Sequence, residues 1–381
     1  MNFDPTPDQA ALYKEVLGFA RGALRDDVAQ LEAAGEFPRA AWDRCAAFGL
    51  QGLPIPPEYG GLGADPISII LALEALGYGC EDNGLIFSIN AQLWACETPI
   101  VRFGTEEQKR RYLPGLADGS LIGAHAMSEP GSGSDAFALR TSAVRRGDAY
   151  VLDGGKTFVT NAPVADVFVV FATTDPSRGF AGLCAFLVDR DTPGLSLGRP
   201  LGKMGLKTSP MSEVFLDDCE VPADRLLGRP GGGMAVFNSS MEWERGCILA
   251  STVGSMQRQL ERSIAYARER KQFGKPIGAN QAVSHRIADM KVRLEAARML
   301  LYRLGWLMEQ QRSSSLDTAL TKLFLSESFI ASSRDAVSVH GGYGYMTEYG
   351  LERELRDAIG SSLYSGTSDI QRNLIAAHLR L

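Results

Sequence analysis

Glu244 is predicted to lie on an apolar face of a helix, where burying a carboxylate costs free energy. Glu244 falls in line with Phe237, Met241 and Ile248, at steps of four, three and four residues, so the four side chains share one face of a predicted helix. A carboxylate within an apolar stripe is unfavourable unless it is paired or used. Burial would raise its pKa toward the range of a working general base. The alternatives are an ion pair with the neighbouring Arg245 or a helix face that is solvated.

A second candidate is the loop of residues 128–135, whose sequence is Ser-Glu-Pro-Gly-Ser-Gly-Ser-Asp. Its backbone N–H groups are exposed and its hydroxyls can donate, which suits the polar edge of a planar ring or a phosphate. It is not a Walker loop, because no Lys-Ser/Thr pair follows and no helix is predicted after it. A polar connection between two strands would account for the same residues.

Cations gather in a third segment, residues 268–276, with the sequence Arg-Glu-Arg-Lys-Gln-Phe-Gly-Lys-Pro. Positive charge at the C-terminal end of a helix is favoured by the helix macrodipole, which explains the cations alone. It does not explain why Phe273 and Gly274 stand in their midst. An arginine-rich turn with an aromatic ring is well suited to bind a pyrophosphate or a nucleotide.

The elements that must position these residues fall into three blocks. Residues 1–120 show helical periodicity, and Asp8 is predicted to cap the first helix. Residues 121–228 hold short β-branched and aromatic runs separated by Asp, Gly and Pro, which predicts an all-β domain. Long helices return in residues 229–381, one of them with an apolar stripe from Ile287 to Met308. The order is therefore helices, a small β domain and a helical bundle.

Composition excludes several function classes. The 381 residues carry 39 Lys and Arg against 45 Asp and Glu, with no basic excess of the kind that nucleic-acid binders show. No apolar run approaches the ~20 residues that span a bilayer. Six scattered cysteines and four distant histidines predict neither a disulfide framework nor a metal site. Free thiols are typical of a reducing compartment, so we expect a cytoplasmic protein.

Six segments, taken in order, resemble the acyl-CoA dehydrogenase family. They are residues 127–135 (MSEPGSGSD), 156–161 (KTFVTN), 203–210 (KMGLKTSP), 266–277 (YARERKQFGKPI), 341–345 (GGYGY) and 364–372 (YSGTSDIQR). The resemblance covers essentially the whole chain. It implies a mainly α protein with an N-terminal helical domain, a central β-barrel and a C-terminal four-helix domain, assembled as a homotetramer. It also implies FAD and the α,β-dehydrogenation of an acyl thioester.

The resemblance assigns cofactor contacts to positions of this chain. The residues expected to line the flavin ring are Met127, Ser128, Gly133, Ser134, Phe158 and Thr160. Those expected to reach the FAD of a neighbouring subunit are Arg270, Gln272 and Phe273, with Gln281 nearby and Gly342 as a further cofactor contact. Those expected at the phosphate end of the cofactor are Thr367 and Asp369.

Two positions depart from the common family pattern. Many members carry the catalytic glutamate where this chain has Ser365, and a serine hydroxyl is no base at neutral pH. A minority place the base on an earlier helix, directly before a family arginine, and that position is Glu244 before Arg245. The resemblance thus makes Glu244 the expected base, with Arg245, Ser365 and Gly366 on the substrate side. The second departure is Ser338, where the family often has a glutamine that contacts FAD.

Finer resemblance points to a substrate class. Residues 239–245, 280–286 and 364–369 resemble dehydrogenases of natural-product pathways, some of which oxidise acyl or prolyl groups held on a carrier protein. The expected substrate is a short, branched or cyclic acyl or aminoacyl thioester, on a carrier protein or on CoA. The expected electron acceptor is an electron-transfer flavoprotein or oxygen. Two alternatives are a flavin oxidase or monooxygenase of the same fold and a non-catalytic FAD-binding scaffold.

Overall fold

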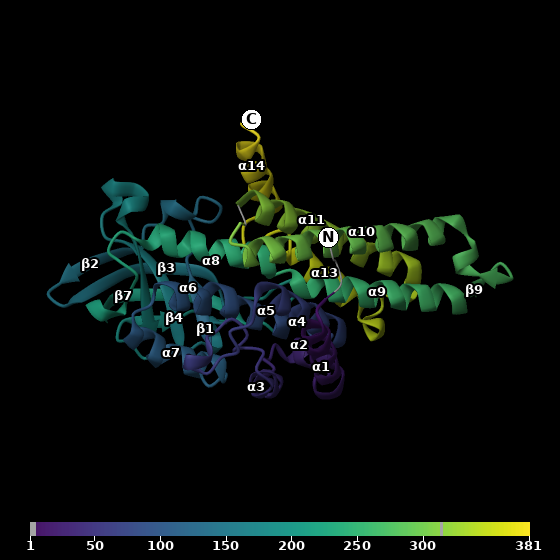
Figure 1. The fold of residues 1–381 in the computed structure, drawn as a ribbon, viewed down its shortest axis with the longest axis horizontal. Helices are drawn as coiled ribbons and strands as arrows, with labels where there is room; N and C mark the ends of the chain where they lie inside the picture. Colours follow the sequence, from purple (N-terminus) through teal and green to yellow (C-terminus); the bar gives the residue numbers. More distant parts are fainter. Residues whose placement is uncertain (1–4, 313–314) are drawn as a thin grey trace.

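The computed structural model describes residues 5–312 and 315–381, which form an elongated molecule with a β-sheet toward one end (Figure 1). The first region is helical. Its helices are α1 (Pro7–Ala23), α2 (Val28–Ala34), α3 (Arg39–Phe48), α4 (Pro66–Gly79), α5 (Asn83–Gln92), α6 (Thr98–Phe103) and α7 (Glu106–Ala117). A π-helical turn, Leu93–Glu97, joins α5 to α6.

The first helix begins differently from the prediction. Thr6, not Asp8, is the N-cap: its hydroxyl accepts from the N–H of Gln9 at 3.3 Å, and the Gln9 side chain accepts from the N–H of Thr6 at 3.0 Å. This reciprocal capping box leaves Asp8 in the first turn, where a negative charge is favoured by the helix dipole. Pro7 at the first helical position needs no N–H partner and fits this start.

The middle region is a sheet. Its strands are β1 (Gly123–Ala126), β2 (Ser142–Arg146), β3 (Ala149–Thr160), β4 (Val167–Thr173), β5 (Leu183–Asp189), β6 (Leu195–Leu197), β7 (Met211–Pro222) and β8 (Leu226–Leu227). The strand order is β6-β7-β3-β2-β4-β5-β8, and β1 pairs with β4 in parallel.

The expected β-barrel does not close. The two ends of the sheet are β6, with three residues, and β8, with two, and no pairing joins them among the strands that the structure describes. A barrel requires its first and last strands to pair along their length, which strands this short cannot do. The middle domain is therefore an open sheet.

The third region is helical again. It contains α8 (Gly233–Cys247), α9 (Ala250–Glu269), α10 (Gln281–Glu309), α11 (Ser315–His340), α12 (Gly342–Tyr345), α13 (Leu351–Gly360) and α14 (Ser368–His378). Between α9 and α10 a hairpin of β9 (Lys271–Gln272) and β10 (Lys275–Pro276) forms the end of the molecule opposite the sheet (Figure 1). No described helix is long and apolar enough to cross a membrane.

Two glycines let the first and third regions approach closely. A Cβ on Gly77 of α4 would lie 1.9 Å from the carbonyl oxygen of Ser251, and one on Gly254 of α9 would lie 2.0 Å from that of Glu74. Only glycine allows such a backbone approach. The crossing joins both helical regions in one hydrophobic core and fixes the start of α9, directly after the segment that carries Glu244.

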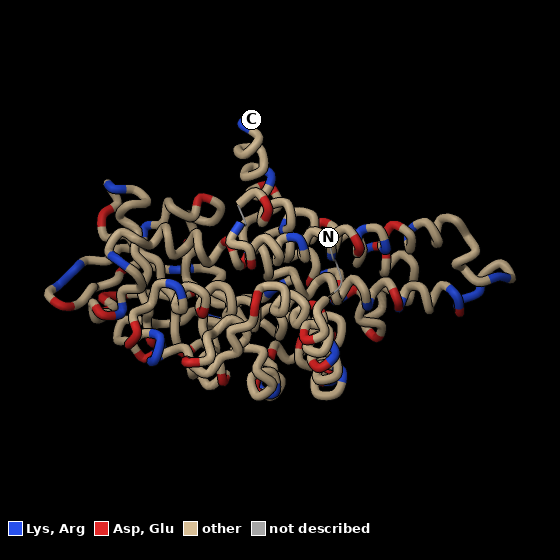
Figure 2. The backbone as a smooth tube through the Cα atoms, in the orientation of Figure 1, with Lys and Arg blue, Asp and Glu red and all other residues tan. Residues whose placement is uncertain are grey.

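Charge is distributed without a large region of one sign, apart from cations at the hairpin of β9 and β10 (Figure 2). Within residues 5–312 and 315–381, no group of three or more His, Cys, Asp or Glu side chains could hold a metal ion.

Candidate active site

Glu244 lies on the last turn of α8, on the face that its spacing predicts. Phe237, Met241 and Ile248 are buried with it, and Glu244 itself is only 9% exposed. The solvated-face interpretation is therefore wrong. The ring of Phe237 packs edge-on against Phe171 of β4, with 5.8 Å between ring centroids, which seats α8 on the sheet. The sheet and the helical region thus meet at the helix that carries the carboxylate.

The two carboxylate oxygens of Glu244 have different surroundings. Oε1 accepts a hydrogen bond from the Ser365 hydroxyl at 2.5 Å, whereas Oε2 is buried and has no hydrogen-bond partner among the described residues. Burial raises the pKa of Glu244, and the hydrogen bond from Ser365 and the charges of Arg245 and Lys322 oppose that rise. A buried carboxylate with one free oxygen and a raised pKa is suited to accept a proton.

The turn between α13 and α14 brings the expected substrate-side residues to Glu244. Ser365 and Gly366 both have left-handed backbone, with φ of 56° and 84°. A Cβ on Gly366 would lie 2.8 Å from Nε2 of Gln371 and 3.6 Å from Nε of Arg245, so glycine allows the turn to pack here. Burial lowers the pKa of Arg245 and the charge of Glu244 raises it. Arg245, Ser365 and Gly366 are therefore close together, as the resemblance implies.

Sequence reasoning missed Lys322, because the residues at helical spacing around it include the polar Ser326 and show no continuous apolar stripe. Lys322 falls in line with Ala319, Ser326 and Phe329 on the buried face of α11. Its side chain has no exposed surface. Its Nζ donates to the carbonyl oxygens of Ser361 and Gly366, each at 2.8 Å, and so contacts the same turn.

The loop of residues 127–135 lies beside the end of β3. The N–H of Thr157 donates to the carbonyl of Ser128 at 2.9 Å, which brings the loop to Phe158. Phe158 has a φ of 56°, sits at an irregularity in the pairing of β3 with β7, and is 66% exposed. The other expected flavin contacts on the same two segments are Met127, which is buried, Gly133 and Ser134, which are exposed, and Thr160, which is half-buried.

A buried ion pair fixes this loop. Nζ of Lys156 lies 2.7 Å from Oε1 of Glu129 and also donates to the carbonyl of Met127 at 3.2 Å. Thr141 donates to the same carboxylate through its N–H at 2.9 Å and its hydroxyl at 2.5 Å. Burial alone would raise the pKa of Glu129, but the bonds from Lys156 and Thr141 outweigh it and lower the pKa. An exposed apolar ring beside a polar loop held by this ion pair fits the flat face and polar edge of a flavin.

The second group of expected cofactor residues lies elsewhere. The guanidinium of Arg270 stacks over the ring of Tyr343, 5.5 Å from its centroid, and so brings Arg270 to the segment of Gly342. Gln272 and Phe273 lie on the hairpin after α9, where Phe273 has a φ of 51° and is 96% exposed. Figure 1 places this hairpin at the end of the molecule opposite β3. One chain therefore does not bring the two groups together.

The remaining predicted residues are near helix ends. Thr367 is the N-cap of α14, its hydroxyl accepting from the N–H of Ile370 at 3.2 Å. Asp369 is exposed and lies 3.5 Å from Arg372. Gln281 is the exposed first residue of α10. Ser338 donates its hydroxyl to the carbonyl of Arg334 at 2.9 Å, within its own helix.

A small cavity lies beside Tyr364, the residue that precedes Ser365. It measures about 20 Å³, and its lining includes Phe87 of α5, Ile248 at the end of α8 and Thr252 of α9. The rings of Phe87 and Tyr364 pack 4.5 Å apart. Aromatic rings thus bound this cavity, which has room for about one water molecule.

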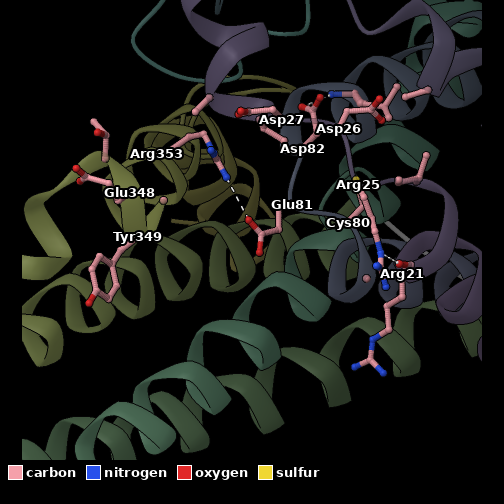
Figure 3. Close-up of a pocket in the computed structure, with 18 of the residues that line it drawn as sticks. Arg21, Arg25, Asp26, Asp27, Cys80, Glu81, Asp82, Glu348, Tyr349 and Arg353 are labelled. Atoms are coloured by element: carbon pink, nitrogen blue, oxygen red, sulfur yellow. Dashed lines mark hydrogen bonds and ion pairs between the residues drawn. The ribbon is translucent and has the colours of Figure 1, made fainter.

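A larger cavity lies elsewhere in the molecule. It measures about 690 Å³, and none of the residues predicted for the site lines it. Figure 3 shows that its walls mix both charges, and Arg353 lies 3.4 Å from Glu81 across it.

Sequence profiles match all three regions of the chain. Residues 6–120, 124–219 and 231–380 match the N-terminal, middle and C-terminal domains of acyl-CoA dehydrogenase. The chain belongs to the acyl-CoA dehydrogenase family. As a member of this family it is an FAD-dependent enzyme acting on acyl thioesters, which sets aside the non-catalytic scaffold.

Individual relatives of this acyl-CoA dehydrogenase are similar over nearly their whole length. An L-prolyl-[peptidyl-carrier protein] dehydrogenase of Pseudomonas fluorescens is 50% identical over 92% of this chain and 94% of its own. The crystal structure of the prolyl acyl carrier protein oxidase AnaB has a TM-score of 0.98 and 49% identity, covering 99% of this chain and 100% of that one. PigA with FAD and proline has a TM-score of 0.98 and 40% identity over both whole chains.

Proposed function

We propose that this enzyme oxidises an L-prolyl group held as a thioester on a carrier protein, with Glu244 as the base. The observation that carries the proposal is the buried Glu244 carboxylate, whose Oε1 is held by Ser365 while Oε2 is free. The named activities of the Pseudomonas fluorescens and AnaB relatives support the prolyl group and its carrier. We also propose that the chain divides into three domains, residues 1–120, 121–228 and 229–381.

Glu244 and Ser365 each contribute to removal of the α proton of the substrate. Glu244 accepts the α proton at Oε2, and the hydroxyl of Ser365 stabilises the carboxylate through Oε1. The N–H of Ser365 has no hydrogen-bond partner among the described residues, and it polarises the thioester carbonyl so that the α proton becomes more acidic. FAD, when bound, supplies the acceptor for the hydride that leaves the β carbon. The loop of residues 127–135 and Phe158 hold the cofactor.

The names of the relatives support a small, cyclic acyl group. The packed rings of Phe87 and Tyr364 leave a cavity of only about 20 Å³ beside Ile248, so a long acyl chain that reached this region would meet aromatic rings.

The test is anaerobic bleaching of the flavin with defined thioesters. L-prolyl-carrier protein should reduce the flavin faster than L-prolyl-CoA, and both faster than hexanoyl-CoA. If L-prolyl-CoA reduced the flavin faster than L-prolyl-carrier protein, the proposed carrier-protein substrate would be wrong. If hexanoyl-CoA reduced it faster than both prolyl thioesters, the proposed prolyl group would be wrong. Glu244→Gln protein is the control for bleaching that does not need the base.

The terminal acceptor defines a second candidate function. AnaB is named an oxidase, whereas the Pseudomonas fluorescens relative is named a dehydrogenase. Rapid reoxidation of the reduced enzyme by air would support an oxidase. Slow reoxidation by air with rapid reoxidation by an electron-transfer flavoprotein would support a dehydrogenase.

Self-association as a homotetramer is part of the proposal. Val292, Met299 and Trp306 recur every seven residues on α10 and are exposed by 67%, 38% and 45%. Such an apolar stripe is costly in water and favours a protein partner. A second copy is the partner we propose, because Phe273 of each chain would then reach the cofactor of a neighbour. Met299→Glu should give smaller assemblies in light scattering, whereas Lys14→Glu, an exposed charge change on α1, should not.

The proposed compartment remains the cytoplasm. All six cysteines are buried and free, which a reducing environment preserves.

A further inference from the structure

Lys322 is a buried cation whose hydrogen bonds all go to main-chain carbonyls of one turn. Its side chain has no exposed surface. Nζ donates to Ser361 at the start of the turn and to Gly366 at its end, both at 2.8 Å. Burying an ammonium is expensive, so a lysine placed this way must gain from its position. The ammonium also lies over the ring of Tyr364, 5.7 Å from its centroid.

The turn needs external ties because its backbone is strained. Ser365 has a φ of 56°, a left-handed conformation that side chains other than glycine adopt at a cost. Besides Lys322, Gln371 holds the turn by donating to the carbonyl of Gly366 at 2.9 Å. With its two ends fixed, the turn presents the hydroxyl of Ser365 to Glu244. The position of the catalytic hydrogen bond thus depends on Lys322.

Lys322 also interacts electrostatically with Glu244 and its neighbour Arg245. The charged groups that act on Lys322 are Glu244 and Arg245, both from α8. The attraction is mutual, because the ammonium in turn favours the ionised form of Glu244. Arg245 does the same from its own helix.

We propose that Lys322 is a positioning residue for proton abstraction: it holds the turn of residues 361–366 so that Ser365 faces Glu244, and its charge stabilises the Glu244 carboxylate. The inference rests on the proposed role of Glu244 as the base. It assigns to α11 a part in the reaction although Lys322 contacts neither substrate nor cofactor.

The pH dependence of the Lys322 charge distinguishes its two roles, which are to hold the turn and to stabilise the Glu244 carboxylate. Burial lowers its pKa to about 7, while the charge of Glu244 raises it and that of Arg245 lowers it. A neutral amine still has two hydrogens and can donate to both carbonyls. Above neutral pH the turn therefore stays in place while the charge beside Glu244 is lost.

The experiment compares Lys322→Met, which removes charge and hydrogen bonds, with Lys322→Arg, which keeps the charge. The measurement is the pH dependence of single-turnover flavin reduction by L-prolyl-carrier protein under anaerobic conditions, with butyryl-CoA as a second thioester. In Lys322→Met the pKa of Glu244 rises, so the acid limb of the profile should move upward by roughly one pH unit, the size that a nearby opposite charge produces. In Lys322→Arg the acid limb should stay near that of the wild type.

A matched control is Lys203→Met. Lys203 is half-buried and likewise donates to two main-chain carbonyls, those of Leu206 and Ser209. The charge that raises its pKa belongs to Asp357 and not to Glu244. Its loss should therefore leave the acid limb in place, whatever it does to stability. FAD content and melting temperature identify folded enzyme, and Lys322→Gln replaces the methionine variant should that variant not fold.

The outcomes separate the two proposals. An unchanged acid limb in folded, FAD-loaded Lys322→Met or Lys322→Gln overturns the role of Lys322, and so does an equal shift in Lys203→Met. Undiminished flavin reduction by Glu244→Gln overturns the proposed base itself. Loss of activity in Glu244→Gln together with an unshifted limb in Lys322→Met rejects only the inference about Lys322.

Discussion

Ser365 donates its hydroxyl hydrogen to Glu244 across 2.5 Å, although 121 positions separate them in the chain. The position where many relatives carry their base is thus occupied by a hydrogen-bond donor to the residue that we assign as the base here. The contact thus links the serine at the common base position to the glutamate on the earlier helix. A glutamate at each position would place two carboxylates side by side, and like charges so close cannot both ionise.

Glu244→Gln should abolish proton abstraction while FAD stays bound. The amide keeps the size of the side chain and accepts from Ser365, but it cannot take a proton. Flavin reduction should fall by ~10²–10⁴-fold, the usual contribution of a positioned general base. Glu97→Gln is the matched control. Burial raises the pKa of Glu97 well above its usual value. Because an amide of the same size can still accept from Gln92, the change should leave the rate nearly unaltered.

Ser365→Ala should change the pH dependence more than the maximal rate. The hydrogen bond from Ser365 lowers the pKa of Glu244, so its loss raises that pKa and moves the acid limb to higher pH. A hydrogen bond to a charged group is worth ~1.5–3 kcal/mol, which corresponds to about one to two pH units. The check is single-turnover flavin reduction between pH 5 and 9, roughly the range over which the protein should stay folded. A rate loss that is uniform with pH would contradict this account.

The double variant Glu244→Gln with Ser365→Glu should recover part of the activity lost in Glu244→Gln. The two side chains already meet, so a carboxylate at position 365 lies near the same reacting carbon. Recovery of ten-fold or more over Glu244→Gln, on the order of 1.4 kcal/mol of barrier, would support a shared site. No recovery in protein that binds FAD would show that the two positions approach the substrate differently.

Phe87→Ala should enlarge the small cavity beside Tyr364. Removing the ring that packs on Tyr364 opens space beyond Ile248, so hexanoyl-CoA should gain in rate relative to an L-prolyl thioester. A buried Phe→Ala change also costs ~3–5 kcal/mol of folding free energy. Phe186→Ala, in the core of the sheet, controls for that loss, because it should lower the melting temperature without changing the ratio of the two rates.

Local patterns in the sequence predicted part of this site. The helical spacing around Glu244 correctly indicated a buried carboxylate, since burial on one helix face leaves a periodic signal. Lys322 leaves a weaker signal, because the polar Ser326 interrupts the apolar residues at helical spacing around it. The contact of Phe87 with Tyr364 leaves no such signal, because the two residues come from different regions of the chain. The open ends of the sheet depend on which strands pair, which local composition does not determine.

The distance between Phe158 and the hairpin of Phe273 has a genetic consequence. In an assembly where each cofactor is held by the sheet of one subunit and the hairpin of another, no single chain contains all the residues of one active site. Two inactive variants, one damaged only at Glu244 and one only at Phe273, would then form mixed pairs in which one site collects both defects and the other has none. Co-expressed alleles of this kind would complement each other, whereas two alleles damaged at the same end would not.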